Sequence, residues 1–280
     1  MIVLGTNVYP ARGAAAERQA RAVAALAALP GVLAVNVTWP DEAVEVEGMR
    51  TVPALRRDSV EVTGRPGPRK PLITDLLDVL AGIAEREGAD RFGFANSDIA
   101  VTPAAVEHAR GSGAPALAFV RVDVEGPGGG VVGYSAGTDV VVFSLPFWRR
   151  HRRRFRPYLV GEPVWDFVYA ALIAGAGGEI VSRLPLVVHE AHPQAWHGSP
   201  FAEYTRVLAA LDRPLFARYM HYLAALERAG PALTQAEALL IQRAVFGARP
   251  SPGARVLQLA RAAAAVARYA ARRAAAAAGR

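Results

Sequence analysis

The start of the chain alternates strand, helix and strand signals, and this alternation restricts the class of fold more than any other feature. Residues 2–4 are a short apolar run, residues 17–29 carry Val23 and Leu26 on one helical face, and residues 32–39 are apolar and β-branched. A unit of this kind joins two parallel strands by a right-handed crossover. We therefore predict an α/β protein with a Rossmann-type mixed sheet flanked by helices.

Later segments continue the pattern up to about residue 200. Apolar residues at helical spacing predict a helix over 72–87, and a second helix is predicted over 163–174. Further strands are predicted at 92–95, 116–124, 138–144 and 180–188, and Val52 starts another. The glycine-rich residues 125–133 lack the lysine and the following helix of a phosphate-binding loop, so they indicate a hairpin loop.

The character of the chain changes after residue 200. Helical patterns cover 201–211, 215–229 and 234–246, the last beginning with a capping box of Thr234 and Glu237. A linker at 247–253 precedes an Ala/Arg-rich helix at 255–280. This predicts a core domain of residues 1–200, a helical extension of 201–250 packed on it, and a helical tail of 251–280.

The net charge of +7 and the pI near 10.2 favour anionic partners. The excess is concentrated in Arg149–Arg156 and in the tail, so an acidic membrane surface is a possible partner and the total charge does not require nucleic acid. The chain has no cysteine, which excludes disulfides and thiolate metal sites. With no signal peptide visible, we expect a cytoplasmic bacterial protein, at most peripheral to the inner face of the membrane.

Polar residues follow two of the predicted strands at their carboxyl ends, where α/β proteins bind ligands. Asn96, Ser97 and Asp98 end the strand at 92–95, and Thr6 and Asn7 end the first strand. A carboxylate at such an edge suits a metal ion, and Thr6 and Asn7 suit a nucleotide. The competing interpretation is a pair of ordinary polar loops, because Asn, Ser and Asp are common in turns.

Two further groups carry chemistry-bearing side chains. Trp165 beside Asp166, at the start of a predicted helix, combines a stacking surface with a carboxylate that can act as a general base. The alternative is a core tryptophan and a first-turn acid. His189 and His192 lie at the end of a predicted strand, with Trp196 and His197 nearby, and one histidine joined to Asp98 could complete a divalent metal site.

These groups occur in an order that resembles nucleotide-diphospho-sugar transferases of the GT-A fold. The resemblance covers roughly residues 1–200 and rests on Asn96-Ser97-Asp98-Ile99, Gly137-Thr138-Asp139, Gly161 to Asp166, and His189 to His192. It implies a GT-A-like nucleotide-sugar-binding domain and a glycosyltransferase that moves a sugar from a nucleotide-diphosphate donor to a glycan, lipid-linked or small-molecule acceptor.

The resemblance also implies roles for single residues. Asp98 would hold Mn²⁺ or Mg²⁺ with His189 or His192, while Asn96 replaces the first aspartate of the family's acidic turn. Trp165 and Asp166 would lie on the acceptor side, with Asp166 as the base. The nucleotide and its phosphates would contact Thr6, Asn7, Asn96, Ser97, Asp139, and Lys70 or Arg65.

Two alternatives stay open at this point. A relative that binds a sugar nucleotide or glycan without catalysis is suggested by Asn96, which removes one carboxylate from the turn. A basic protein that binds acidic lipid or RNA is suggested by Arg149–Arg156 and the tail, where aromatic residues interleave with arginines.

Overall fold

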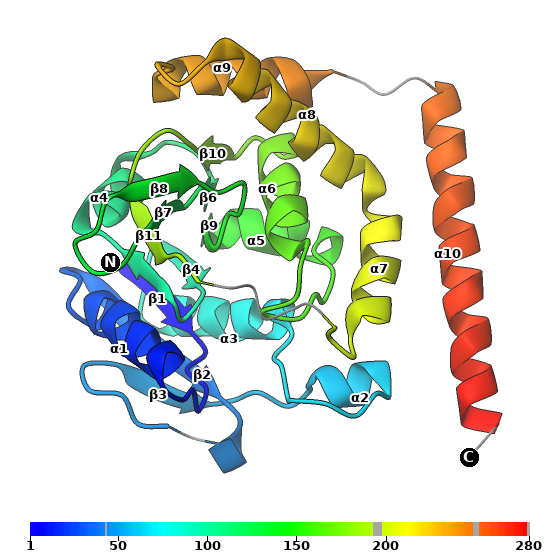
Figure 1. Ribbon diagram of the computed structural model, residues 1–280, viewed down its shortest axis with the longest axis horizontal. Helices are drawn as coiled ribbons and strands as arrows, with labels where there is room; N and C mark the ends of the chain where they lie inside the picture. Colours follow the sequence, from blue (N-terminus) through cyan, green and yellow to red (C-terminus); the bar gives the residue numbers. More distant parts are fainter. Residues whose placement is uncertain (43, 193–197, 249–251, 279–280) are drawn as a thin grey trace.

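The centre of the protein is a mixed β-sheet (Figure 1). The computed structural model describes residues 1–42, 44–192, 198–248 and 252–278. Among them, seven strands form this sheet in the order β10-β6-β9-β4-β1-β2-β3. The strands are β1 (Ile2–Thr6), β2 (Val32–Thr38), β3 (Arg50–Pro53), β4 (Arg91–Ala95), β6 (Ala116–Phe119), β9 (Val140–Ser144) and β10 (Glu179–Val181). β1 to β4 run parallel, whereas β9 is antiparallel to both β4 and β6.

A smaller four-stranded sheet lies beside the first, in the order β5-β11-β7-β8. Its strands are β5 (Ile99–Val101), β7 (Val122–Val124), β8 (Val131–Tyr134) and β11 (Val187–Glu190). The single strands predicted at 116–124 and 180–188 are therefore wrong, because each divides between the two sheets. The crossings contain Arg121 in the first case and Ser182 and Arg183 in the second, but the apolar residues on either side of them preserve a strand-like pattern. The predicted hairpin at 125–133 is confirmed, since β7 pairs antiparallel with β8.

Helices cover both faces of the main sheet, which confirms the predicted α/β class. One hydrophobic cluster joins the sheet to α3 (Ile73–Arg86), α5 (Leu145–His151) and α6 (Trp165–Gly175). A second cluster joins the opposite face to α1 (Ala14–Ala27) and α4 (Pro103–Gly111). α4 begins with Thr102 capping the helix and Pro103 in its first turn. A short helix, α2 (Ser59–Thr63), precedes α3.

The C-terminal helices are α7 (Ala202–Leu211), α8 (Arg213–Ala229), α9 (Gln235–Gly247) and α10 (Pro252–Ala278). α8 packs on α6 through the stacked rings of Phe167 and Tyr219, whose centroids are 5.3 Å apart. α9 is joined to β10 by Gln242, which accepts from Ile180 N at 2.8 Å and donates to Gly178 O at 2.8 Å. The capping box of Thr234 and Glu237 is confirmed. The domain boundaries at 200 and 250 stay predictions.

The arginine-rich run forms α5 and a 3-10 turn, Arg152–Arg154. Three of its arginines are ion-paired: Arg149 with Glu85, Arg152 with Asp78 at 2.6 Å, and Arg156 with Asp212 at 2.7 Å. The run therefore has less uncompensated positive charge than the sequence indicates. Across the described parts of the chain, no helix has both the length and the apolarity needed to cross a bilayer.

Candidate metal centre and carboxylate pair

The smaller sheet aligns an acid and an imidazole from strands distant in sequence. In the β-sheet register, His189 on β11 lies opposite Ile99 on β5 and opposite Asp123 on β7. Asp98 immediately precedes β5, and His192 follows β11. The fold thus brings together the polar turn after β4 and the histidine segment, which the sequence separates by about ninety positions.

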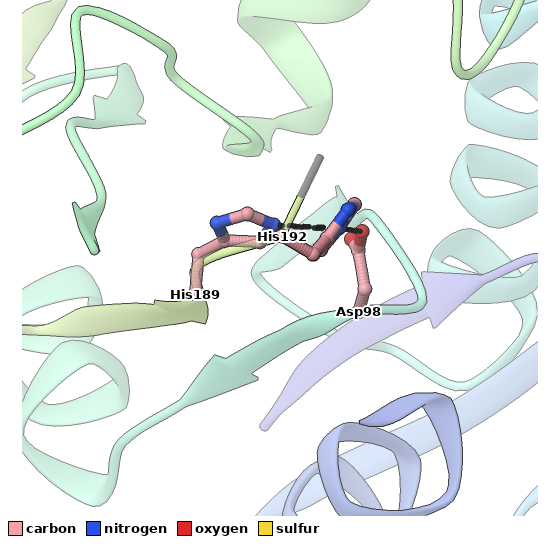
Figure 2. Close-up of side chains that lie close together, drawn as sticks. All are labelled: Asp98, His189 and His192. Carbon is pink, nitrogen blue, oxygen red and sulfur yellow. Dashed lines mark hydrogen bonds and ion pairs between the residues drawn. The ribbon is translucent and has the colours of Figure 1, made fainter. Parts of the chain in front are cut away.

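Asp98, His189 and His192 point toward one another (Figure 2). Asp98 Oδ2 is 3.7 Å from His189 Nε2 and 3.5 Å from His192 Nε2, and the two Nε2 atoms are 3.2 Å apart. Ligands held about 2.1 Å from one ion lie roughly 3.0 to 3.6 Å apart when the angles between them are about 90° to 120°. Two of the three distances lie in this range and the Asp98–His189 distance of 3.7 Å lies just above it, so the three side chains could hold a divalent cation after a small adjustment.

His189 is oriented by a second carboxylate. Its Nδ1 donates to Asp123 Oδ1 at 2.8 Å, which turns Nε2 toward Asp98 and His192. Metal-bound histidines in proteins commonly have such a carboxylate partner. Burial opposes ionisation of Asp98, but the contacts to His189 and His192 outweigh it and hold the pKa of Asp98 well below its usual range. Asp98 is therefore an anionic ligand at neutral pH.

Asn96 holds a neighbouring buried carboxylate. Its Nδ2 donates to Asp139 Oδ1 at 2.7 Å, and Arg121 Nη1 lies 2.6 Å from Asp139 Oδ2. An aspartate at position 96 would place a second negative charge against Asp139, which is only 5% exposed. An amide at this position avoids that repulsion, and Arg121 provides the positive charge beside Asp139.

Asp166, at the start of α6, borders a small space together with Asp139. A Cβ atom added at Gly137 would lie 3.0 Å from Asp139 Oδ2 and 3.1 Å from Asp166 Oδ2, so the glycine keeps the space between the two carboxylates open. Burial, and then the charge of Asp139, raise the pKa of Asp166 to about 7. Asp166 can therefore exchange a proton near neutral pH, as a general base must.

The loop that carries Gly137 is fixed from two sides. Tyr219 on α8 donates its hydroxyl to Ala136 O at 2.6 Å. Thr138 donates its hydroxyl to the carbonyl of Asp166 at 2.7 Å. The helical region after residue 200 thus helps to position the two carboxylates, although the sequence resemblance does not cover it.

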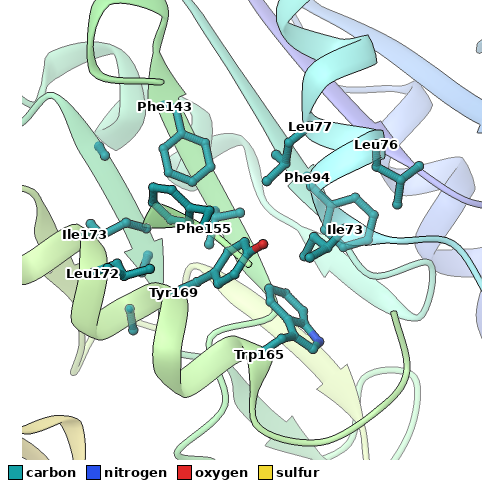
Figure 3. Packing of buried hydrophobic residues seen from close by; sticks show 14 of the residues in the cluster. Ile73, Leu76, Leu77, Phe94, Phe143, Phe155, Trp165, Tyr169, Leu172 and Ile173 are labelled. Carbon is teal, nitrogen blue, oxygen red and sulfur yellow. The ribbon is translucent and has the colours of Figure 1, made fainter. Parts of the chain in front are cut away.

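Several residues predicted as ligand contacts have protein partners in the structure. Trp165 is 2% exposed and packs edge-on against Phe94 and Tyr169, so the core interpretation describes it (Figure 3). Lys70 Nζ lies 2.6 Å from Glu162 Oε1, and Arg65 is 3.3 Å from Glu203. The predicted ligand contacts of these three side chains stay predictions.

The remaining predicted residues lie around the end of β1 and the turn after β4. Thr6 is buried, and its hydroxyl has no hydrogen-bond partner within the described residues. Asn7 donates to Val37 O at 2.7 Å and joins the ends of β1 and β2. Ser97 accepts from Gln19 at 3.1 Å. Trp196 and His197 lie outside the described residues.

Sequence reasoning missed Asp123, Arg121 and Gly137. Asp123 stands between two valines in a segment interpreted as one long strand, and a lone acid in a strand gives no sign of its partner. Gly137 was noted only as part of a motif. The sequence indicates both His189 and His192 as candidate ligands but only one of them beside Asp98, whereas the structure groups both with it.

Val164, directly before Trp165 and Asp166, has a backbone φ of 89°, in the left-handed region that a β-branched residue rarely adopts. We expect Val164→Gly to keep or raise the free energy of unfolding, by up to about 1 kcal/mol, because glycine removes the left-handed penalty. Urea unfolding measures this change. Val79→Gly is the matched control, since Val79 is also half-buried against the core but helical, and it should lose stability. Equal losses in both variants would contradict strain at Val164.

Solved structures with a similar chain path include residues 1–349 of S. aureus TarS, with UDP-GlcNAc (TM-score 0.45, 10% identity, covering 88% of this chain and 71% of that one) and without it (TM-score 0.43, 11% identity, covering 88% and 70%). Another is the mannosyltransferase PcManGT from Pyrobaculum calidifontis in complex with GDP-Man and Mn²⁺ (TM-score 0.41, 12% identity, covering 96% and 82%). No protein-family model and no curated protein matches the chain. At these TM-scores and identities, similarity assigns neither family nor activity.

Proposed function

We propose that the protein is a glycosyltransferase that uses a nucleotide-diphosphate sugar as donor and a hydroxyl compound as acceptor. One observation carries this proposal: Asp98 belongs to one motif of the resemblance and His189 and His192 to another, and the two motifs converge after the carboxyl-terminal end of β4 with ligand atoms 3.2 to 3.7 Å apart. The two carboxylates around Gly137 supply an adjacent place for proton transfer.

Asp98, His189 and His192 would hold a divalent cation, which as a Lewis acid offsets the charge of a nucleoside-diphosphate leaving group. Two imidazoles and one carboxylate suit Mn²⁺ better than Mg²⁺, because Mg²⁺ prefers oxygen ligands. The second histidine replaces the ligand that Asn96 does not provide. Asn96 instead holds Asp139, as described above.

Asp166 would take the proton from the acceptor hydroxyl. Its pKa of about 7 makes the carboxylate available at neutral pH while keeping it basic enough to accept a proton. Burial raises the pKa of Asp139 and Arg121 opposes that shift, while the charge of Asp139 helps to raise the pKa of Asp166. A side chain at position 137 would crowd the carboxylate of Asp166, so the glycine keeps that carboxylate free of such a contact.

Thermal unfolding with UDP or GDP, each with Mn²⁺, with Mg²⁺ or with EDTA, tests the proposal. We expect a rise in melting temperature with at least one nucleotide, largest with Mn²⁺ and lost with EDTA. A ligand at 100 times its dissociation constant adds about 2.7 kcal/mol to the free energy of unfolding, which is readily measured. The absence of a shift with any of the common nucleoside diphosphates in the presence of Mn²⁺ would contradict the proposal.

A binding protein without catalytic activity is the second candidate. Asn96 favours it, because Asp98 is then the only carboxylate among the three grouped ligands. Nucleotide binding without hydrolysis or transfer, across glycan, lipid-linked and small-molecule acceptors, would support this candidate over the transferase.

A further inference from the structure

The C-terminal helix α10 combines exposed positive charge with an exposed apolar face. The helix contains no Asp or Glu, and its arginines are Arg255, Arg261, Arg268, Arg272 and Arg273. Arg261 and Arg268 are exposed, two helical turns apart on one face. α10 runs along the outside of the molecule beside α7 (Figure 1).

The apolar face of α10 is uncovered. Val256 is 68% exposed, Leu257 is 51% exposed and Leu259 is 72% exposed. At 100° per residue, Val256 and Leu259 share a face with Ala263, Ala267 and Ala270, and these alanines are exposed as well. That face lies well away from the one that carries Arg261 and Arg268, whereas the exposed Leu257 lies on the basic side, within about 40° of these two arginines. A surface helix normally turns its aliphatic side chains toward the protein, so this orientation indicates an external partner.

We propose that α10 is a docking element for a membrane surface that contains anionic phospholipids. Basic residues near such a surface are attracted by its negative potential, and aliphatic side chains at the start of the helix can enter the headgroup region. RNA fits the charge but not the exposed Val256, Leu257 and Leu259, because single-stranded RNA binding relies on aromatic stacking. The role is independent of the chemistry at Asp98 and Asp166.

Co-sedimentation of the full chain with vesicles tests this proposal. One set contains phosphatidylcholine alone, and the other contains phosphatidylcholine with phosphatidylserine. We expect binding only to the second set, weakened by salt. Each basic residue near the surface contributes about fivefold in affinity, so Arg261→Glu with Arg268→Glu should lower the partition coefficient at least about 25-fold. Replacing Val256 and Leu259 by serine should weaken binding without changing the net charge.

The matched control reverses two exposed arginines of the other basic segment, Arg150→Glu with Arg153→Glu, and has the same net charge. It should bind vesicles nearly as well as the unchanged protein. Equal losses in the two double variants would overturn the assignment to α10, because net charge alone would then explain binding. No binding to phosphatidylserine vesicles would also overturn it, and retention on single-stranded RNA would then assign the helix to nucleic acid. Circular dichroism confirms that each variant is folded.

Discussion

Replacing Asp98 by asparagine is expected to abolish the melting-temperature shift that Mn²⁺ and a nucleoside diphosphate produce, and with it sugar transfer. The amide keeps the size of the side chain but removes the only carboxylate from the three grouped ligand residues. The loss of Mn²⁺ affinity should exceed the roughly 10-fold to 100-fold effect of removing an outer partner of a metal ligand. Isothermal titration with Mn²⁺ measures it directly.

Two further variants make this result specific. Asp123→Asn removes the carboxylate that accepts from His189 Nδ1, so it should give the smaller effect, about 10-fold to 100-fold in Mn²⁺ affinity. Asp90→Asn removes a charge from the opposite end of β4, where the side chain is 88% exposed, and should change nothing. If Asp98→Asn binds Mn²⁺ as tightly as the unchanged protein, the proposed metal centre is wrong.

Asp166→Asn is expected to lower the rate of transfer by about 100-fold to 10,000-fold while nucleotide binding persists. The amide cannot accept the proton of the acceptor hydroxyl, and Asp166 is not among the three residues of the metal centre. In the unchanged protein, kcat/KM should fall below pH 7, because the base becomes protonated below its pKa of about 7. Rates measured from pH 5 to 9 test both statements. Wild-type turnover by the asparagine variant would remove Asp166 from the mechanism.

The same substitution is expected to stabilise the fold at alkaline pH. The pKa of Asp166 is raised from about 3.9 in an unfolded chain to about 7 in the folded protein, so the folded state binds this proton more tightly. The unchanged protein therefore loses stability as the pH rises from about 4 to 7, and the loss persists above 7. Asp166→Asn lacks this loss, and its unfolding free energy should exceed that of the unchanged protein by about 1–3 kcal/mol at pH 8, with no gain at pH 4.

Another first-turn acid provides the control for this stability effect. Asp75 on α3 lies 2.6 Å from Arg57, and its charge is therefore compensated. Asp75→Asn should lower the free energy of unfolding at pH 8, whereas Asp166→Asn should raise it. Chemical denaturation of both variants at pH 4 and pH 8 separates a helix-dipole effect, common to both acids, from the burial of Asp166. Destabilisation of Asp166→Asn at pH 8 would contradict the raised pKa.

Local sequence patterns determined most of the secondary structure. The first strand–helix–strand unit and the capping box at Thr234 depend on neighbours within a few residues, so the sequence alone predicted them. Side-chain period also placed α3 and the C-terminal helices. The same side-chain period gave wrong strands at 116–124 and 180–188, where the chain passes from one sheet to the other. Alternation shows which face of a strand is buried, but it does not show which sheet the strand joins.

The candidate site was only partly accessible from sequence. The order of the motifs singled out Asp98, Asp166, His189 and His192, because each is a chemically distinctive residue beside a strand or helix signal. The pairing of these residues depends on the order of strands β5, β11 and β7, which long-range contacts decide. Only the folded chain shows that Asp123 orients His189 and that Asn96 serves Asp139.

Burial and charge compensation were likewise decided by the tertiary structure. The sequence predicts that Trp165, Lys70 and the arginines of residues 149–156 contact ligands. The fold buries Trp165 and pairs Lys70 with Glu162, and it neutralises Arg149, Arg152 and Arg156 with carboxylates from distant segments. Sequence thus determined the class of fold and the chemical types at the site. The tertiary structure decided which of them meet, because pKa values and ligand distances depend on neighbours that the chain brings together only when it folds.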